Sequence, residues 1–431
     1  MEIEHLYRLF SEHQTVTTDS RDCPEGSIFF ALKGESFDGN RFAETALQKG
    51  CPYAVIDEPE YARDERYIVT DNALDTLKQL ARHHRRQFDI PVIGITGTNG
   101  KTTTKELVAA VLSKKYKVLY TEGNFNNDIG VPKTLLRLRK EHEIAVIEMG
   151  ASHPGDIKTL VETVEPDYGL ITNVGKAHLQ GFGSFEGVVR TKGELYDFLR
   201  RRNGSKVFID AANRHLAAIS GGLDLIKYAC EPMDGLYVEG EVTSCAPLLC
   251  FRWRGGEGGW HEVETHLIGT YNLCNMLAAA SIGLYFGVGD DAVSDALAGY
   301  IPSNNRSQLE TTEHNRLIVD AYNANPTSMA AAIKNFSDMQ VSRKMAILGD
   351  MRELGDSSEE EHQKVADMLE HAGIDTVWLV GEEFGKTRCA FRKFADAEEV
   401  KAELRKNMPE DHYILIKGSN GMKLYQLPEL L

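Results

Sequence analysis

The chain has 431 residues, of which 42% are hydrophobic, which is enough for two to four domains with buried cores. Its 64 acidic and 48 basic residues give a formal net charge of -16, which argues against a nucleic acid or an anionic membrane as the partner. The seven cysteines include no CxxC pair, so we expect reduced thiols in a cytoplasmic protein and neither a disulfide framework nor a zinc site.

Residues 1–85 have the pattern of a small α/β module. Short mixed segments alternate with turn-rich stretches such as TTDSRDCPEG and KGESFDGN, and the segment ends in a charged amphipathic helix, LKQLARHHRRQF. The first ten residues, MEIEHLYRLF, lack the basic region and apolar core of a signal peptide, so we expect no secretion leader.

A glycine-rich stretch at residues 94–106, GITGTNGKTTTKE, connects a strand-like run, IPVIGIT, to a helical pattern, LVAAVLSKK. Glycines let backbone N–H groups close around an anion, and the helix N-terminus adds a favourable dipole. Lys101 can reach terminal phosphates and Thr102 can bind magnesium. Ile95 stands where a strict Walker A motif has glycine. A tight turn that only packs a helix on a sheet is the alternative, and we favour an ATP site.

Polar residues follow several of the next apolar runs in residues 86–302. Glu148 ends EIAVIE, His178 follows LITNVGKAH, and Lys192 lies in RTKGELYDFL, early in an expected helix. Ligands of parallel α/β sheets gather at the carboxyl ends of strands, and a carboxylate beside Thr102 would complete a magnesium site. Taken alone, Glu148 could be a cap, His178 a structural residue, and Lys192 a solvated helix lysine.

The remaining runs of residues 86–302, including KVLYT, DYGLITNV and KVFID, alternate with helical segments as a mostly parallel doubly wound sheet requires. Residues 235–268 contain strand-like runs that are interrupted by glycines, which predicts hairpins appended to that sheet. The uncharged stretch 267–289 contains Asn, Gly and Ala in numbers that favour a buried helix starting near Asn272 over a membrane span.

Residues 303–431 show a second alternation of strand-like and helical segments. The strand-like runs are RLIVDAY, KMAILGD, TVWLVG and YILIKG. We expect a third, smaller Rossmann-like domain, and the fold class is therefore α/β with three domains: 1–85, 86–302 and 303–431.

Motifs along nearly the whole chain resemble, in order, the Mur ligases of bacterial cell-wall synthesis. They are TGTNGKT, GNFNNDIGVP, AVIEMGAS, ITNVGKAHLQGFGS, RTKGELY, GTYNLCNMLAAAS, NRSQ, DAYNANPTSM and KGSNGM. DAYNANPTSM and GDMRELGDSSEEEH are most similar to members that add D-alanyl-D-alanine to a UDP-N-acetylmuramoyl-tripeptide. TDSR and FFALKGESFDGNRF are similar to the uridine-nucleotide-binding domain of the family.

The resemblance implies an ATP-dependent amide ligase. A peptide carboxylate would attack the γ-phosphate of ATP to give an acyl phosphate and ADP, and an incoming amine would displace phosphate. Such chemistry needs mainly positioning and charge neutralisation. The implied substrates are ATP, a UDP-N-acetylmuramoyl-tripeptide (UDP-MurNAc-tripeptide) and D-alanyl-D-alanine, with Mg²⁺ at two sites. We expect a monomer that binds no nucleic acid and inserts in no membrane.

The resemblance also assigns site residues. Lys101, His178 and Lys192 would be catalytic; Thr102 and Glu148 would hold one magnesium ion, and His178 and a carbamate on Lys192 would help to hold the second. CO₂ added to a neutral lysine amine turns a repelled cation into an anionic oxygen ligand. The residues assigned to ATP are Gly97, Thr98, Asn99, Gly100, Lys101, Thr102, Thr103, Asn275 (adenine), Asp320 (ribose) and Arg306 (γ-phosphate). Those assigned to the other substrates are Ser20, Arg21, Asn124, Asn127, Asp128, Asn323, Lys417 and Ser419.

Other interpretations remain open from the sequence. Asp320 could cap a helix, Asn275 could satisfy buried backbone, and Arg306 could form an ordinary ion pair. Tyr271 and Asn420 depart from the residues usual in the family, His and Arg. The chain could also be a nucleotide switch without ligation, or a relative that adds a single amino acid to a muropeptide or to folate.

Overall fold

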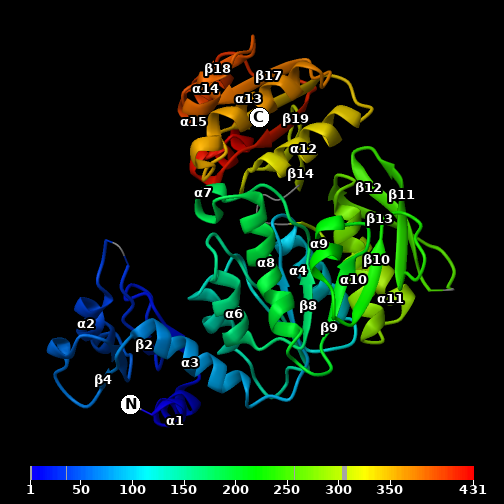
Figure 1. Cartoon of the computed structure of the whole chain (residues 1–431). Helices are drawn as coiled ribbons and strands as arrows, with labels where there is room; N and C mark the ends of the chain where they lie inside the picture. Colours follow the sequence, from blue (N-terminus) through cyan, green and yellow to red (C-terminus); the bar gives the residue numbers. More distant parts are fainter. Residues whose placement is uncertain (1, 35, 257, 303–307) are drawn as a thin grey trace.

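The computed structural model describes residues 2–34, 36–256, 258–302 and 308–431. Three β-sheets lie in successive segments of the chain, within residues 16–69, 92–268 and 308–417. Figure 1 shows the first unit in blue at one end, the central unit in cyan and green, and the third unit in yellow to red at the other end. The expected α/β class with parallel-rich sheets is confirmed.

The first unit is built on a parallel four-stranded sheet of order β1-β2-β3-β4. Its strands are β1 (Val16–Thr17), β2 (Ile28–Phe30), β3 (Ala54–Ile56) and β4 (Tyr67–Val69). Its helices are α1 (Ile3–His13), α2 (Ala43–Gln48), α3 (Ala73–Arg85) and the 3₁₀ turns η1 (Gly39–Phe42) and η2 (Pro59–Tyr61).

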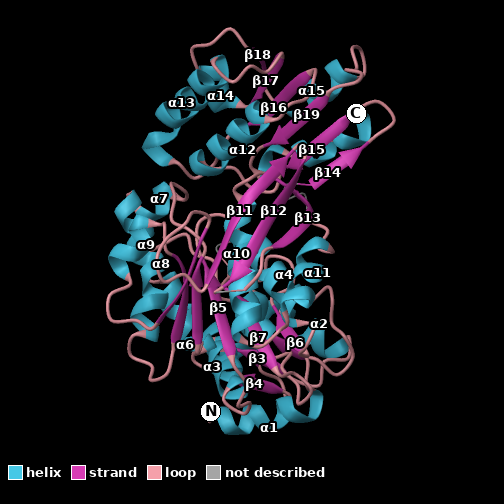
Figure 2. Cartoon of the chain, turned by 90° about the vertical axis from the view of Figure 1, so that its right-hand side faces the viewer, coloured by secondary structure: helices cyan, strands magenta, loops and turns pink. Residues whose placement is uncertain are grey.

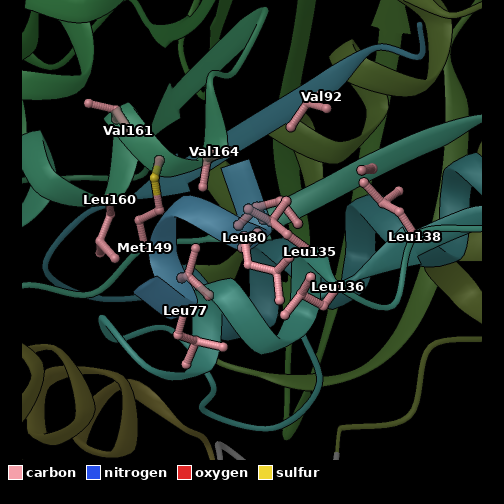
Figure 3. Packing of buried hydrophobic residues seen from close by; sticks show 14 of the residues in the cluster. Leu77, Leu80, Val92, Leu135, Leu136, Leu138, Met149, Leu160, Val161 and Val164 are labelled. Atoms are coloured by element: carbon pink, nitrogen blue, oxygen red, sulfur yellow. The ribbon is translucent and has the colours of Figure 1, made fainter. Parts of the chain in front are cut away.

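Helix α3 joins the first unit to the central one. Asn72 caps its N-terminus by accepting from Asp75 N, and its apolar face places Leu77 and Leu80 in one continuous core with residues of the central unit. Figure 3 shows these two leucines among Leu135, Leu160 and other side chains of that core. On its polar face, Arg82 and Arg86 pair with Glu165 and Arg85 pairs with Asp167; the core and the ion pairs together attach α3 to the central unit.

The central sheet has nine strands in the order β13-β12-β11-β10-β9-β8-β5-β7-β6. The strands β5 to β11 run parallel, and β12 and β13 add as antiparallel hairpins, as the glycine-broken segment predicts. The strands are β5 (Val92–Thr96), β6 (Val118–Tyr120), β7 (Ile144–Glu148), β8 (Tyr168–Ile171), β9 (Lys206–Asp210), β10 (Leu225–Ala229), β11 (Val238–Cys245), β12 (Leu248–Gly255) and β13 (His261–Ile268).

Both faces of the parallel part of this sheet are buried. Ala145 and Ile147 of β7 lie in the core that α3, α6 and α8 share, whereas Ile144 and Val146 lie in the core under α4, α10 and α11. This alternation explains why the strand reads as a continuous apolar run. The helices are α4 (Lys101–Leu112), α5 (Gly130–Leu135), α6 (Asp156–Val164), α7 (Leu179–Phe182), α8 (Phe185–Leu199), α9 (Arg214–Ile219), α10 (Asn272–Tyr285) and α11 (Asp290–Ala298).

Two sequence predictions concern these helices. Helix α10 begins at Asn272 as predicted, and none of the helices that the structure describes is long and apolar enough to span a bilayer. The expected position of Lys192 early in a helix is wrong, because α8 starts at Phe185 with Ser184 as its cap and Lys192 lies at its middle.

The third unit has a six-stranded sheet of order β14-β15-β19-β16-β17-β18, parallel except for the edge strand β14. Figure 2 shows it above the long β11–β12 hairpin. The strands are β14 (Gln308–Thr311), β15 (Arg316–Asp320), β16 (Lys344–Gly349), β17 (Thr376–Val380), β18 (Arg392–Phe394) and β19 (Tyr413–Lys417). The helices are α12 (Pro326–Asp338), α13 (Ser358–Glu370), α14 (Glu382–Lys386), α15 (Ala397–Leu404) and the 3₁₀ turns η3 (Gly355–Ser357), η4 (Asn420–Met422), η5 (Leu424–Gln426) and η6 (Pro428–Leu430).

Candidate active site

The glycine-rich loop lies between β5 and α4, as its sequence predicts. Gly97 has φ 144°, and a Cβ there would lie 2.0 Å from Thr172 Oγ1. Gly100 has φ 76°, and its Cβ would lie 2.7 Å from Asn275 Oδ1. Both positions therefore need glycine for backbone conformation and for space. Helix α4 starts at Lys101, so its free N–H groups face the loop.

Asn173, which follows β8, holds the loop in shape. Its Oδ1 accepts from Asn99 N at 3.0 Å, its Nδ2 donates to Asn99 O at 3.0 Å, and its carbonyl accepts from Thr98 N at 2.9 Å. The Lys101 ammonium donates to the carbonyls of Gly97 at 2.9 Å and Thr98 at 3.1 Å. The loop is thus fixed before any ligand binds, with a cation at its centre.

Thr102 and Glu148 meet where β5 and β7 end side by side. The Thr102 hydroxyl donates to Glu148 Oε1 at 3.2 Å, and Asn126 Nδ2 donates to the same oxygen at 2.7 Å. Glu148 is fully buried, yet its Oε2 has no hydrogen-bond partner among the residues that the structure describes. A buried carboxylate oxygen without a partner is unfavourable, and a hard cation would satisfy it. This donor set fits magnesium.

Lys192 is 2% exposed, so the interpretation of a solvated helix lysine is wrong. Its ammonium nitrogen lies 3.4 Å from Ala151 O and 5.4 Å from the ring centroid of Phe182. Burial, and secondly the Lys101 cation, hold the pKa of Lys192 well below its usual value. A neutral amine is the form that reacts with CO₂, so this environment fits the expected carbamate.

His178 lies at the boundary between the central and third units. It precedes α7 in the left-handed conformation, with φ 49°, and its imidazole Nδ1 is in close contact with the carboxylate of Glu353 in the third unit. Glu353 follows β16, within the stretch GDMREL. The two residues therefore connect the end of β8 to the third unit.

Two further predicted residues have partners within the protein. Asn275 on α10 accepts from Thr104 Oγ1 at 3.0 Å and donates to Asn272 Oδ1 at 2.8 Å, beneath the phosphate loop. Asp320, at the end of β15, accepts from Lys417 Nζ at 2.5 Å, and this lysine also donates to Asn323 O at 3.2 Å. The buried Lys417 thus fixes the Asp320 side chain and the loop that leads to α12.

The N-terminus of α12 brings the third unit against the phosphate loop. Asn325 Nδ2 donates to Asn99 Oδ1 at 2.8 Å, and Thr327 Oγ1 accepts from Lys176 N at 3.0 Å. A cavity of about 900 Å³ lies at this junction. The predicted site residues that line it are Thr98, Asn99, Gly100, Lys101, Thr102, Thr103, Asn124, Asn127, Asp128, Glu148, His178, Asn275, Asp320, Asn323 and Lys417.

Other predicted residues lie elsewhere. Ser20 and Arg21 are in the first unit away from this cavity, and Arg21 pairs with Asp19 on the surface. Ser419 Oγ accepts from Arg352 N at 3.0 Å outside the lining. Arg306 falls outside the described residues.

Sequence reasoning missed several residues that shape the site. They are Asn126, Asn173, Asn325, Thr327 and Glu353. All lie within stretches that stand out in the sequence, but the chemistry of each depends on a partner at least 22 positions away along the chain.

Comparison with known proteins decides the family. Three family models match successive segments: "Mur ligase family, catalytic domain" over residues 12–92, "Mur ligase middle domain" over 95–283 and "Mur ligase, glutamate ligase domain" over 305–420. UDP-N-acetylmuramoyl-tripeptide–D-alanyl-D-alanine ligase of Escherichia coli (strain K12) is 35% identical over 424 residues, covering 96% of this chain and 93% of the relative. The enzyme of the same name from Bacillus subtilis (strain 168) is 33% identical over 435 residues, covering 96% and 92%.

The chain belongs to the Mur ligase family. Solved structures of Mur ligases share its fold over nearly the whole length. MurF from Acinetobacter baumannii superposes with a TM-score of 0.87 at 30% identity, covering 98% of this chain and 97% of that one. MurF ligase from Thermotoga maritima in complex with ADP superposes with a TM-score of 0.86 at 26% identity, covering 97% of each chain.

Proposed function

We propose that this Mur ligase joins D-alanyl-D-alanine to a UDP-N-acetylmuramoyl-tripeptide, with ATP converted to ADP and phosphate. The observation that carries the proposal is the cavity at the junction of the central and third units, in which Lys101, Glu148 and His178 share one space with Asp320 and Asn323. A nucleotide switch without ligation would leave Glu148, His178 and Lys192 without a role. The full-length similarity to named D-alanyl-D-alanine ligases selects the dipeptide as the amine substrate.

The phosphate loop would hold the triphosphate of ATP. Backbone N–H groups at the start of α4 and the Lys101 ammonium would face the phosphates, where they would neutralise charge that moves toward ADP during transfer. Asn275 would lie against adenine and Asp320 would accept from ribose hydroxyls. Both line the cavity on opposite sides of the domain junction, so ATP would contact both units.

Thr102 and Glu148 would hold one magnesium ion, and His178 would contribute to a second. Magnesium supplies positive charge to the phosphate oxygens when it is bound. The chain's own contribution is orientation: Asn126 and Thr102 fix Glu148 Oε1 and leave Oε2 directed at no protein donor among the described residues.

Lys192 would carry a carbamate. Its amine is buried on α8, beside Phe182 and Ala151, and burial favours the neutral form, so that addition of CO₂ with loss of a proton would turn this amine into an anionic oxygen ligand. The anion would be neutralised by Lys101 and the bound magnesium. This modification gives an otherwise inert helix position an oxygen ligand.

In the reaction, the terminal carboxylate of the acceptor peptide attacks the γ-phosphorus of ATP, which forms an acyl phosphate and releases ADP. The amine nitrogen of D-alanyl-D-alanine then attacks the acyl carbon, and phosphate and a proton leave. The protein's part is to place three substrates in one space, and such positioning accounts for much of the rate of phosphoryl transfer.

The three segments would divide this work. Residues 1–85, with Ser20 and Arg21, would bind the uridine nucleotide; residues 86–302 would bind ATP and, through Asn124, Asn127 and Asp128, the acceptor peptide. Residues 303–431 would present the dipeptide, with Asn323, Lys417 and Ser419 shaping its site and Arg306 reaching the γ-phosphate. We further propose that the enzyme acts as a monomer, and its need for ATP supports a cytoplasmic location.

Phosphate release tests the proposal. It would be measured at saturating ATP and magnesium for every pairing of UDP-MurNAc-dipeptide or -tripeptide with D-alanyl-D-alanine, lysine or diaminopimelate. We expect turnover only with a tripeptide acceptor and the dipeptide amine together. Turnover with the dipeptide acceptor and a single amino acid, and none with D-alanyl-D-alanine, would reject the substrate assignment and leave the ligase class intact.

A further inference from the structure

Helix α7, which follows His178, is seated on the third unit. Gln180 N donates to Glu353 O at 3.2 Å, and a Cβ on Gly355 would lie only 3.4 Å from Gln180 Cβ. Leu179 packs against the hydrophobic core of the third unit, in which Leu354 is buried. Figure 1 shows α7 at the end of the central unit that faces the yellow-to-red unit. The backbone around His178 is therefore positioned by a turn of another domain.

The side chains of His178 and Glu353 also connect the central unit to the third unit. Both His178 and Glu353 adopt left-handed backbone conformations, with φ 49° and 64°, and their side chains are in contact across the boundary between the two units. The rings of Phe182 and His178 are nearly perpendicular, with centroids 6.1 Å apart at an interplanar angle of 84°.

An imidazole held in this way has distinct nitrogens. When Nδ1 carries a proton and donates to a carboxylate, the lone pair of the neutral ring is on Nε2. Carboxylates beside metal-binding histidines fix ring orientation and tautomer in this manner. Glu353 is a group of the third unit that does so for a residue of the central unit.

We propose that Glu353 is a positioning residue that orients His178, so that the second magnesium site is complete only when the third unit is docked on α7. The inference rests on the proposed role of His178 in holding magnesium. Docking of the third unit would then have two effects. It would complete the second magnesium site next to ATP, and it would present the amine substrate.

Two substitutions at Glu353 separate the effect of side-chain length from the effect of the negative charge. Glu353→Gln keeps the length and an acceptor oxygen for Nδ1–H but removes the charge, whereas Glu353→Asn is too short to reach and tolerates a positive φ. The matched control is Glu370→Ala, an exposed glutamate of the same unit at the end of α13. We expect kcat to fall about 10-fold to 100-fold for Glu353→Asn, less for Glu353→Gln, and not at all for the control.

A second readout does not depend on turnover. In protein with ¹⁵N-labelled histidine, the His178 ring signals, identified by their loss in His178→Ala, should report Nδ1–H in the wild type and a shift toward Nε2–H in Glu353→Asn. In the His178→Ala background, Glu353→Asn should lower kcat by less than about twofold further, because both changes act through one group.

Three results would overturn the inference. They are an unchanged His178 tautomer in Glu353→Asn, an undiminished effect of that substitution in the His178→Ala background, and a rise in KM for the amine substrate with kcat unchanged, which would mean that Glu353 contacts the amine. If the wild type ligates another amine than D-alanyl-D-alanine, the same cycle is run with that amine, so failure of the substrate assignment is distinguishable from failure of this inference.

Discussion

Asn325 at the start of α12 makes two side-chain hydrogen bonds, one within the third unit and one to the central unit. Its Oδ1 accepts from Ser328 N at 2.9 Å and so caps α12, while its Nδ2 donates to Asn99 Oδ1 of the phosphate loop at 2.8 Å. The domain that would carry the amine thus contacts the loop that would carry ATP through one residue.

Replacing Asn325 can separate these two roles. Asn325→Ser keeps a capping oxygen but is too short to reach Asn99, so we expect an unchanged melting temperature and a KM for ATP raised about threefold to tenfold, the equivalent of about 1 kcal/mol. Asn325→Ala should show the same KM and also lose about 1 kcal/mol of stability. Steady-state kinetics and thermal melting measure both; an unaltered KM in the two variants would mean that the contact with Asn99 is not used in ATP binding.

Lys101→Ala should lower kcat on the order of 100-fold or more, since it removes the cation at the centre of the phosphate loop. Lys114→Ala, at an exposed lysine just after the same helix, is the control and should behave as the wild type. The circular dichroism spectrum should be the same for all three proteins. Near-normal turnover of Lys101→Ala would remove the loop from the mechanism.

Glu148→Gln should make the protein without ligands more stable and weaken its use of magnesium. Without magnesium and ATP, we expect the variant to be more stable than the wild type by about 1 kcal/mol, because a buried charge with an unpartnered oxygen is replaced by a neutral amide. Its kcat at ordinary magnesium should fall on the order of 100-fold. Denaturant unfolding and a magnesium titration of activity would check this. A variant that is less stable than the wild type without magnesium would contradict the destabilising effect of the unpartnered Glu148 oxygen.

Lys192→Ala should be inactive and recover part of its activity when acetate or formate fills the space left by the side chain. In the wild type, ¹³C-bicarbonate should give a carbamate signal that is absent from the variant, because burial lowers the pKa of Lys192 and so favours the neutral amine that reacts with CO₂. Full activity of the untreated variant would rule out a role for the carbamate.

His84 should make the free energy of unfolding decrease as the pH is lowered. Burial lowers its pKa in the folded protein from 6.5 to about 4, so the unfolded chain binds the proton more readily. The stability from a neutral His84 is therefore fully present above pH 6.5 and is lost as the pH falls from 6.5 through about 4, a loss of about 3 kcal/mol at most.

Denaturant unfolding between pH 7 and pH 4 measures the contribution of His84. The variant His84→Gln should show a shallower loss of stability over this window than the wild type, whereas His371→Gln, at an exposed histidine, should keep the wild-type slope. Equal slopes for His84→Gln and the wild type would show that this histidine does not contribute.

Local sequence signals predicted the three-part α/β organisation and the strand–glycine turn–helix at residues 92–112 because both depend on periodicity and on backbone needs. Strands β14 and β18 were not predicted, since short edge strands such as QLET and RKF bury too little to impose an apolar pattern. The five-residue strand β10, LIKYA, was also missed, although its apolar and β-branched residues gave a readable signal.

The site was predictable only as far as single residues carry a signal. Glu148 and Asp320 end their strands as predicted, but the burial of Lys192 could not be foreseen, because its helix packs against partners from other parts of the chain. The pairs Asn325 with Asn99 and Glu353 with His178 join residues of different domains, and one sequence contains no record of which distant residues meet.

The most direct test of the central claim is the mass of the product. Purified protein would be incubated with ATP, magnesium, D-alanyl-D-alanine and UDP-MurNAc-tripeptides ending in lysine or in diaminopimelate, and the nucleotide-linked products would be weighed by mass spectrometry. We predict a UDP-linked product heavier than at least one tripeptide by D-alanyl-D-alanine less one water, with one ADP per product. ADP formed without that product, or a product lengthened by a single amino acid when single amino acids replace the dipeptide, would contradict it.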